Sequence, residues 1–446
     1  MKNLSTLLLL LVTVGELFGQ SAAERMGTYL QLLTDAEQFS GSVLVARGDQ
    51  VLFSKGFGEA AIEYGVPITP TTKFRIGSIT KQFTAMAVMK LVEEGKIDLE
   101  APIVDYLADY PEEIGKKVSI HHLLTHSSGI PSYTGMAEIM KHRGSMEEAP
   151  EDFIKNFWDK ELEFKPGSEF KYNNSGYYLL GMIIEKVSGV PYDEYLKQNI
   201  FDPLGMKNSG FEHYRDVIPN MAEGYAAVGD YPEKAGNIVT DMAGAAGALY
   251  STTEDLLRWH RALLEKKIVS EAAYEKIFTP FLNNYGFGWT IEERSGKTVY
   301  SHSGGIDGFR SMGILMPEEK LSVIVLANLE SANSTRVAQD MAKMYLGEEV
   351  EMPKELEVVE VGPEILEKYA GTYNLFPGFD IEIEPNGDHL LIHPTNQNVS
   401  PVFPESETIF FSKIVNAKLE FVVNDEGVVN EVILHQNGSH PGKRIE

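Results

Sequence analysis

The stretch FRIGSITK, residues 74–81, places a serine and a lysine three positions apart where a helical pattern of apolar residues begins. The pattern continues to Gly95, a residue type that commonly ends a helix. On a helix, Ser78 and Lys81 would share one face, with their Cβ atoms about 5–6 Å apart. A partly buried lysine can lose its proton and accept that of a serine. Taken alone, the stretch is better explained by a helix N-cap followed by a solvated lysine.

A second Ser-x-x-Lys pair, Ser168 and Lys171, follows the turn-forming pair Pro166-Gly167. In that context the lysine has no reason to face the serine. Ser78 and Lys81 are therefore the candidate nucleophile and base.

Tyr172-Asn173-Asn174 supplies further groups for acyl transfer. A phenol close to an ammonium has its anion favoured, so Tyr172 is expected to pass protons between Ser78 and a leaving group. The side-chain amide of Asn174 can hold both Lys81 and a substrate carbonyl. Each residue alone fits an ordinary core aromatic or a turn.

His302-Ser303-Gly304-Gly305 joins a strand-like run to a glycine-rich turn. Glycine lets another backbone approach closely, as an added substrate strand would. The N–H groups near Gly305 and at Ser78 would form an oxyanion hole, in which losing one donor costs about 3–4 kcal/mol. His302 is expected to donate a hydrogen bond to the substrate or to Tyr172. Together, the three segments predict a serine hydrolase that works through a covalent acyl-enzyme.

The bulk composition limits the alternatives. A chain of 446 residues with 43% hydrophobic residues is expected to form two domains. Its net charge of −26 argues against nucleic-acid binding. The absence of cysteine excludes disulfides, thiolate metal sites and a cysteine nucleophile. His121, His122 and His126 lack the glutamate of a His-Glu-x-x-His site, and phosphate-binding and dinucleotide fingerprints are missing, so no metal or organic cofactor is expected.

The first residues have the pattern of a signal peptide. Lys2 precedes an apolar run from Leu7 to Val14, and small residues follow. We expect a leader over residues 1–23, cleaved after Gly19 or Ala23, and hence a periplasmic or extracellular protein. An uncleaved anchor is the weaker alternative because a bilayer span needs about 20 apolar residues. No later segment is long and apolar enough to cross a membrane.

The rest of the chain divides into a hydrolase domain (24–347), an acidic linker (348–363) and a tail (364–446). In the first domain we expect strands at residues 42–46, 51–53, 298–301, 311–315 and 321–327. We expect helices at residues 120–124, 177–188, 192–200, 254–264 and 335–345. This order favours a mixed α/β domain with a largely antiparallel sheet. A capping box is expected at Ser251–Glu254. Six short strand-like runs in the tail predict a small β-barrel or sandwich: 371–373, 379–384, 390–393, 409–412, 419–423 and 429–436.

From about Gly41 to Leu346 the chain resembles the serine β-lactamase and penicillin-binding-protein superfamily, specifically its class C β-lactamase-like branch. The resemblance rests on the Ser-x-x-Lys, Tyr-x-Asn and His-x-Gly segments and on several stretches around them. These stretches are residues 74–77 (FRIG), 122–129 (HLLTHSSG), 166–167 (PG), 248–251 (ALYS) and 285–289 (YGFGW).

The resemblance implies a helical domain beside an α/β domain, with the active site between them. Ser78 would be acylated, Lys81 and Tyr172 would share the proton transfers, and Asn174 would bind substrate. The family's third motif is usually Lys-Thr/Ser-Gly, and its lysine helps hold a substrate carboxylate. A histidine with a pKa of about 6.5 would hold that carboxylate less firmly at neutral pH. His302 therefore argues against strong β-lactamase activity and favours D-aminopeptidase-like relatives.

The tail resembles the lipocalin-like β domain that often follows such hydrolases. Three roles stay open for it: covering the cleft, restricting substrate length or mediating oligomer assembly. The sequence thus predicts an exported serine hydrolase acting on a small peptide, amide or ester, most simply a peptide with D-amino acids. The alternatives are a carboxylesterase or weak β-lactamase, a penicillin-binding sensor that acylates without turnover, and a ligand-binding tail carried on an inactive hydrolase.

Overall fold

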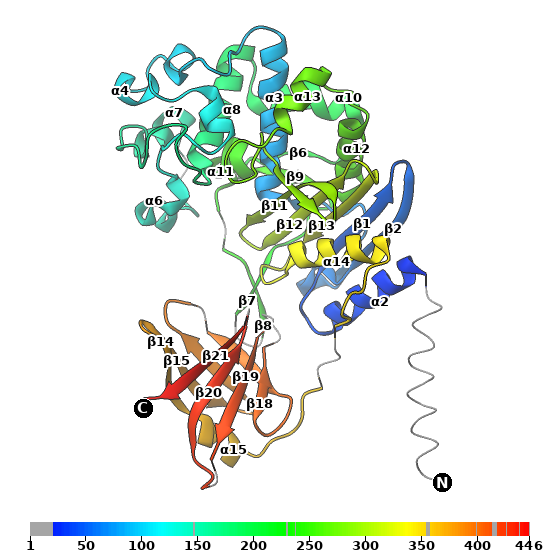
Figure 1. Ribbon diagram of the computed structural model, residues 1–446, viewed down its shortest axis with the longest axis vertical. Helices are drawn as coiled ribbons and strands as arrows, with labels where there is room; N and C mark the ends of the chain where they lie inside the picture. Colours follow the sequence, from blue (N-terminus) through cyan, green and yellow to red (C-terminus); the bar gives the residue numbers. More distant parts are fainter. Residues whose placement is uncertain are drawn as a thin grey trace.

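The computed structural model describes residues 21–145, 148–228, 231–236, 238–353, 357–397, 399–412, 417–424, 426–436 and 438–445. Figure 1 shows a large part built from helices and a sheet, and a β-barrel formed by the C-terminal residues. This arrangement confirms the expected mixed α/β fold followed by a small barrel.

The large part is built on an antiparallel sheet with the strand order β10-β11-β12-β13-β1-β2. Strands from the two ends of this part meet at its centre, where β1 (Gly41–Arg47) pairs with β13 (Leu321–Ala327). The other strands are β2 (Gln50–Phe57), β10 (Thr290–Arg294), β11 (Lys297–Ile306) and β12 (Phe309–Met316). The sheet is therefore complete only when both ends of this part of the chain are present.

Alternate side chains of the central strands enter two different cores. Val43 and Val323 face one core, against α2 (Ala22–Asp35) and α14 (Ser334–Leu346). Their neighbours Leu44 and Ile324 face a larger core that includes the helical region. A strand in a sheet that is buried on both faces is apolar at nearly every position, not only at alternate ones. β13 has this pattern, and all seven of its residues are buried.

The helical region lies between β2 and β10 in the chain. Its helices are α3 (Thr80–Glu93), α4 (Glu112–Gly115), α5 (Ile120–Leu124), α6 (Ala137–Lys141), α7 (Pro150–Phe153), α8 (Asn174–Ser188), α9 (Tyr192–Leu196), α10 (Asp202–Leu204), α11 (Thr240–Gly247), α12 (Thr253–Leu264) and α13 (Glu271–Ile277). Short strands lie among them: β3 (Glu59–Ala61), β4 (Val66–Pro67), β5 (Phe74–Arg75), β6 (Gly210–Phe211), β7 (Tyr225–Val228), β8 (Tyr231–Lys234) and β9 (Leu249–Ser251).

Three expectations for helices need correction. Ser78 lies in a 3-10 turn, η2 (Gly77–Ile79), and α3 begins only at Thr80. The helix expected over 192–200 is interrupted, because a π-helical turn (Lys197–Phe201) follows α9. The cap of α12 is Thr252, whose hydroxyl accepts from the backbone N–H of Asp255, rather than the Ser251–Glu254 box.

The barrel closes with eight strands, two more than the sequence predicted. They are β14 (Gly371–Phe376), β15 (Phe379–Asn386), β16 (His389–Pro394), β17 (Ser400–Pro404), β18 (Ile409–Phe411), β19 (Lys418–Val423), β20 (Val429–His435) and β21 (Ser439–Arg444), preceded by α15 (Pro363–Tyr369). The two missed strands, β17 and β21, contain proline, which usually argues against a strand. β21 closes the barrel by pairing with β14.

The expected leader falls largely outside the described residues. Its last residues, Ser21 to Ala23, belong to the start of α2, where Ser21 and Glu24 form a capping box. At the other boundary, Val350 and Met352 of the expected linker pack against the core under α14. The linker is therefore partly attached to the hydrolase domain.

Candidate active site

The turn that carries Ser78 is pressed against β11. Gly77 has φ +50°, and a Cβ there would lie 2.8 Å from the backbone nitrogen of Gly305. A Cβ on Gly304 would lie 2.0 Å from the carbonyl oxygen of Ile76. Ser311 on β12 donates its hydroxyl to that same carbonyl at 2.8 Å. Glycine at positions 77 and 304 thus allows the His302–Gly305 segment to lie directly beside the nucleophile.

Lys81 is completely buried, and its amine is held by three oxygen atoms. Its Nζ lies 3.0 Å from Ser78 Oγ, 2.8 Å from Oδ1 of Asn174 and 2.7 Å from the carbonyl oxygen of Ala246 on α11. No carboxylate pairs with it among the described residues. Burial therefore lowers the pKa of Lys81 well below its usual value. A neutral amine can donate to Asn174 and Ala246 while its lone pair accepts the Ser78 proton.

Tyr172 lies over the same amine, with its ring centroid 4.8 Å from Lys81 Nζ. The residue is 38% exposed, so one side of the ring faces solvent. Burial nevertheless raises the pKa of the Tyr172 hydroxyl, although its hydrogen bond with Ser78 acts in the opposite direction. The expectation that a nearby ammonium favours the phenolate is therefore wrong, because burial of the hydroxyl raises this pKa. Tyr172 is a proton donor at neutral pH.

Asn174 sits in the first turn of α8 and connects two elements of the site. Its Oδ1 accepts from Lys81, and its Nδ2 donates to the hydroxyl of Thr134 at 3.0 Å. Asn173 before it is the helix cap, since its Oδ1 accepts from the N–H of Gly176 at 2.7 Å. The side chain of Asn174 is only partly buried, so a substrate carbonyl can reach the amide.

His302 differs from the expectation. Its Nδ1 lies 2.6 Å from the carbonyl oxygen of Ser303, and its Nε2 lies 2.9 Å from the hydroxyl of Tyr285. A carbonyl can only accept, so Nδ1 carries the proton and Nε2 accepts from Tyr285. Burial and the nearby Lys81 lower the pKa of His302 to about 4. His302 is therefore neutral, and its hydrogen bonds go to Ser303 and Tyr285 rather than to Tyr172 or a substrate.

The backbone of Ser303 and Gly305 faces an open edge of the sheet. Ile306 and Phe309 pair across the two-residue turn Asp307-Gly308, so even-numbered residues of β11 bond to β12. The backbone N–H and C=O groups of the odd-numbered residues face β10 instead. β10 pairs with β11 only as far as Ser301, so the groups of Ser303 and Gly305 have no partner strand on that side. Ser303 and Gly305 thus present their N–H and C=O groups beside Ser78, as a substrate strand or an oxyanion would require.

Sequence reasoning gave no role to His126 or Tyr285, which complete the site. His126 is fully buried with φ +57°, and its Nδ1 accepts from the N–H of Asn173 at 3.1 Å. Its ring lies 4.3 Å from that of Tyr172 and 4.7 Å from that of Tyr285, between centroids. The ring of His126 thus packs against the ring of Tyr172 and helps to fix its position. The only signal for either residue was its place in the stretches 122–129 and 285–289.

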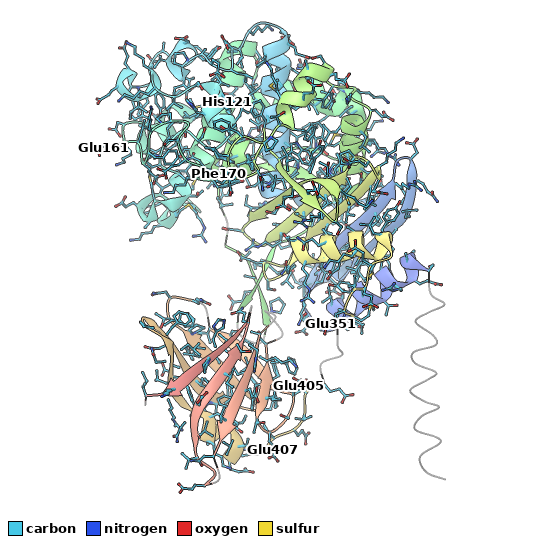
Figure 2. All side chains as sticks on the ribbon, in the orientation of Figure 1. His121, Glu161, Phe170, Glu351, Glu405 and Glu407 are labelled. Atoms are coloured by element: carbon cyan, nitrogen blue, oxygen red, sulfur yellow. The ribbon has the colours of Figure 1, made fainter. Side chains whose placement is uncertain are left out.

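The second Ser-x-x-Lys pair lies apart from this site. The Ser168 hydroxyl donates to the carbonyl of Lys165 at 2.7 Å, and Lys171 forms an ion pair with Glu163 at 2.6 Å. Figure 2 shows the neighbouring Phe170 in the helical region. Within the described ranges, no cluster of three or more histidine or acidic side chains could hold a metal ion. None of the helices in those ranges combines the length and apolar character needed to cross a bilayer.

Comparison with known proteins finds two family models that match separate parts of the chain. The beta-lactamase family model matches residues 28–347, and a domain of unknown function, DUF3471, matches residues 357–444. Penicillin-binding protein 4* of Bacillus subtilis is 30% identical over 94% of this chain and 98% of its own length.

Solved structures extend the similarity to both parts of the chain. An octameric penicillin-binding protein homologue from Pyrococcus abyssi superposes with a TM-score of 0.66 and 30% identity, over 95% of this chain and all of the other. A D-stereospecific amidohydrolase from Streptomyces gives a TM-score of 0.62 and 25% identity, over 73% of this chain and 99% of the other.

Proposed function

Because this chain belongs to the beta-lactamase family and is a serine hydrolase, we propose that it cleaves amide bonds in peptides that contain D-amino acids, through an acyl-enzyme on Ser78. The observation that carries the proposal is the buried amine of Lys81, which lies 3.0 Å from the Ser78 hydroxyl and whose pKa is lowered by burial. A neutral amine at this distance is a general base, which typically contributes 10²–10⁴-fold to rate.

Acylation would begin when Ser78 Oγ attacks the substrate carbonyl and its proton moves to Lys81 Nζ. The carbonyl oxygen becomes an oxyanion that the N–H groups of Ser78 and Gly305 stabilise. As the C–N bond breaks, the Tyr172 hydroxyl protonates the leaving amine. The Lys81 ammonium then returns a proton to Tyr172, and both groups are neutral again. Water attacks the acyl-enzyme by the same steps, which releases the acid and free Ser78.

The state of His302 supports an amide or peptide substrate over a β-lactam. A positive charge at this position would hold a substrate carboxylate, but His302 is neutral and both of its ring nitrogens are engaged. Recognition would instead use the backbone of Ser303 and Gly305 and the amide of Asn174. D-stereospecific hydrolysis is the activity named for the amidohydrolase relative, and this supports D-configured substrates.

Covalent labelling tests the role of Ser78. A fluorophosphonate should add one mass equivalent to the wild-type protein and none to Ser78→Ala. Ser168→Ala is the matched control, because it removes the serine of the other Ser-x-x-Lys pair and should label fully. Labelling of Ser78→Ala at full stoichiometry would refute the proposal.

Substrate assays separate the proposed activity from its alternatives. D-Alanyl p-nitroanilide should be turned over faster than its L-isomer and faster than nitrocefin. Preference for short p-nitrophenyl esters over both anilides would favour a carboxylesterase. A burst without steady-state release would favour a penicillin-binding sensor.

We also propose that the protein is exported and that its barrel mediates assembly. Cleavage after Gly19 would keep the Ser21 capping box of α2, whereas cleavage after Ala23 would remove it. N-terminal sequencing of the mature protein distinguishes the two sites. The octameric homologue supports oligomerisation, which light scattering on the full chain and on a chain without the barrel would test.

A further inference from the structure

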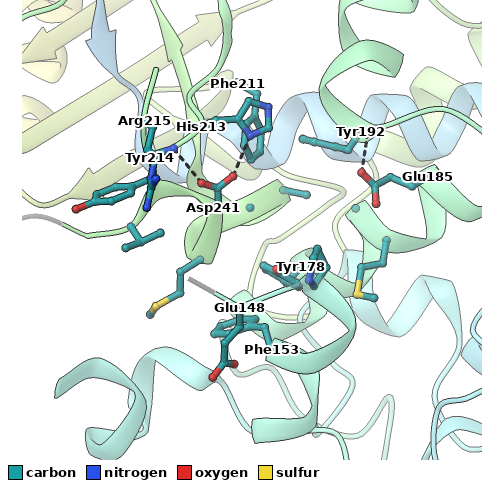
Figure 3. Close-up of a pocket in the computed structure, with 17 residues that line it drawn as sticks. Glu148, Phe153, Tyr178, Glu185, Tyr192, Phe211, His213, Tyr214, Arg215 and Asp241 are labelled. Atoms are coloured by element: carbon teal, nitrogen blue, oxygen red, sulfur yellow. Dashed lines mark hydrogen bonds and ion pairs between the residues drawn. The ribbon is translucent and has the colours of Figure 1, made fainter. Parts of the chain in front are cut away.

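A cavity of about 480 Å³ is lined by residues of α8 and α11. Figure 3 shows the side chains that surround it. Its volume lies within the range of small-molecule sites. Tyr178 and Glu185 line it from α8, and Asp241 and Ala245 line it from α11.

The cavity begins close to the groups that hold the active-site amine. On α8, Asn174 accepts from Lys81, and Tyr178 stands one helical turn further on the same face. On α11, the carbonyl of Ala246 accepts from Lys81, and the preceding Ala245 lines the cavity. The near end of the cavity therefore begins about one helical turn, roughly 5 Å, from these contacts, whereas Glu185 lies about 16 Å further along α8 than Asn174.

Two polar groups in the cavity have hydrogen-bonding capacity that no described residue uses. Tyr178 is only 6% exposed, yet its hydroxyl has no hydrogen bond to any described residue, and Figure 3 shows it pointing into the cavity. Glu185 accepts the backbone N–H of Tyr192 at 2.9 Å with one oxygen, and no described cation pairs with its carboxylate. Burial and the neighbouring acids Asp193 and Glu151 raise the pKa of Glu185. A positive charge beside Glu185 would stabilise its ionised carboxylate and oppose this rise in pKa.

The other charged groups of the cavity are already engaged. Asp241 accepts from the Nδ1 of His213 and from the N–H of Tyr214, both at 2.9 Å (Figure 3). Glu148 accepts from Asn156 at 3.1 Å. Arg215 also lines the cavity, and together with His213 it sits at the end next to Asp241. Because Glu148 is exposed, Glu185 is the partly buried carboxylate of the cavity with which no described cation pairs.

Aromatic rings form the walls around this end. The rings of Phe153 and Tyr178 lie 4.8 Å apart between centroids, and Tyr192 lines the opposite side. Aromatic faces attract both apolar groups and ammonium ions. The walls and Glu185 therefore favour the same kind of molecule.

We propose that this cavity is a binding site for an organic ammonium ion with an aromatic or aliphatic body. The ammonium group lies between Glu185 and the Tyr178 hydroxyl, and the body packs against Phe153 and Tyr192. The ammonium group could be part of the hydrolase substrate or of a separate amine. Glu185, Tyr178 and the aromatic walls would recognise it in the same way in both cases.

Calorimetry on the wild-type protein tests the site with three probes of one shape: phenethylammonium, 2-phenylethanol and phenylacetate. The ammonium should bind at least tenfold more tightly than the alcohol, and the anion more weakly than either. This comparison needs no variant and does not depend on hydrolase activity. Equal affinity for the ammonium and the alcohol would overturn the proposal.

Glu185→Gln assigns the preference to one residue. The glutamine oxygen can still accept the N–H of Tyr192, so the start of α9 is kept. The variant should lose at least fivefold in affinity for phenethylammonium, whereas Glu161→Gln, the same change at the outer edge of the helical region (Figure 2), should lose none. Unchanged affinity in Glu185→Gln would refute the site.

Fluorophosphonate labelling then identifies the source of the amine. If saturating phenethylammonium slows labelling of Ser78, the cavity binds a part of the substrate. If labelling is unaffected while the calorimetric preference holds, the cavity binds a separate amine.

Discussion

The Tyr285 hydroxyl donates to Nε2 of His302 across 2.9 Å, and this bond fixes the neutral ring in the tautomer that carries its proton on Nδ1. Because the pKa of His302 is lowered to about 4, its ionisation lies below the physiological range. The third motif of this hydrolase therefore acts through its backbone and shape rather than through charge.

The pH dependence of kcat/KM should accordingly show no ionisation of His302 between pH 5.5 and pH 8. In His302→Gln the amide oxygen can accept from Tyr285 and the amide nitrogen can donate to Ser303. The pH profile of this variant should keep the wild-type shape even if its rate is lower. An inflection near pH 6.5 that is present in the wild type and absent from the variant would contradict this assignment.

Lys81→Met should change both activity and the pH dependence of stability. Since the folded-state pKa of Lys81 is lowered, the unfolded chain binds one more proton between that value and about 10.5. The free energy of unfolding of the wild type should therefore rise with pH in this window, by up to about 1.4 kcal/mol per pH unit from this residue.

Urea unfolding at pH 7, 8 and 9 measures that slope. Lys81→Met should lose the Lys81 contribution, and its kcat should fall by about 10²–10⁴-fold. Lys171→Met, at the exposed lysine of the second Ser-x-x-Lys pair, is the control and should keep the wild-type slope. Equal slopes in Lys81→Met and the wild type would mean that Lys81 is charged in the folded protein.

Gly304→Ala should be far more damaging than Gly305→Ala. A Cβ on Gly304 would collide with the backbone of Ile76, whereas the nearest atom to a Cβ on Gly305 is 3.5 Å away, at the end of the Arg310 side chain. We expect Gly304→Ala to lose about 1–3 kcal/mol of stability, the usual cost of overpacking, and most of its labelling rate. Similar losses in the two variants, by urea unfolding and labelling kinetics, would show that contact with Ile76 is unimportant.

The hydrolase domain should fold without the barrel. The barrel core around Tyr373 and Phe421 contains no residue of the first two cores. A chain ending after Pro353, which keeps Val350 and Met352 on their core, should label at Ser78 at the wild-type rate. Ending it at Gly347 should lower its melting temperature, because those two side chains are removed. Loss of labelling in the longer version would assign the barrel a part in the active site.

How much of this could be read from the sequence depended on whether a feature is local. β13 was predicted with its exact bounds, because a seven-residue run with six apolar residues and one serine has few other solutions. α5 was predicted equally well. The strands β17 and β21 were missed because both contain proline, which argues against a strand in a local pattern even though each of them pairs with its neighbours in the chain.

In the active site, too, the local features were predicted and those that depend on the whole fold were not. Spacing suggested that Ser78 and Lys81 meet, but the pKa of Tyr172 was predicted in the wrong direction. That pKa is set mainly by the burial of the phenol itself, which depends on the whole fold and not on the local spacing. The partner of His302 was also missed, because Tyr285 lies 17 positions away and reaches it only through the fold.

The edge of β11 beyond Ser301, which β10 leaves unpaired, restricts the substrates that the proposed peptide hydrolysis can use. Only a chain that is already stretched out can lie along that edge and offer its carbonyl to the nucleophile. Compact globular proteins would be safe from attack, whereas loose ends, cross-bridges and short oligomers would be within reach.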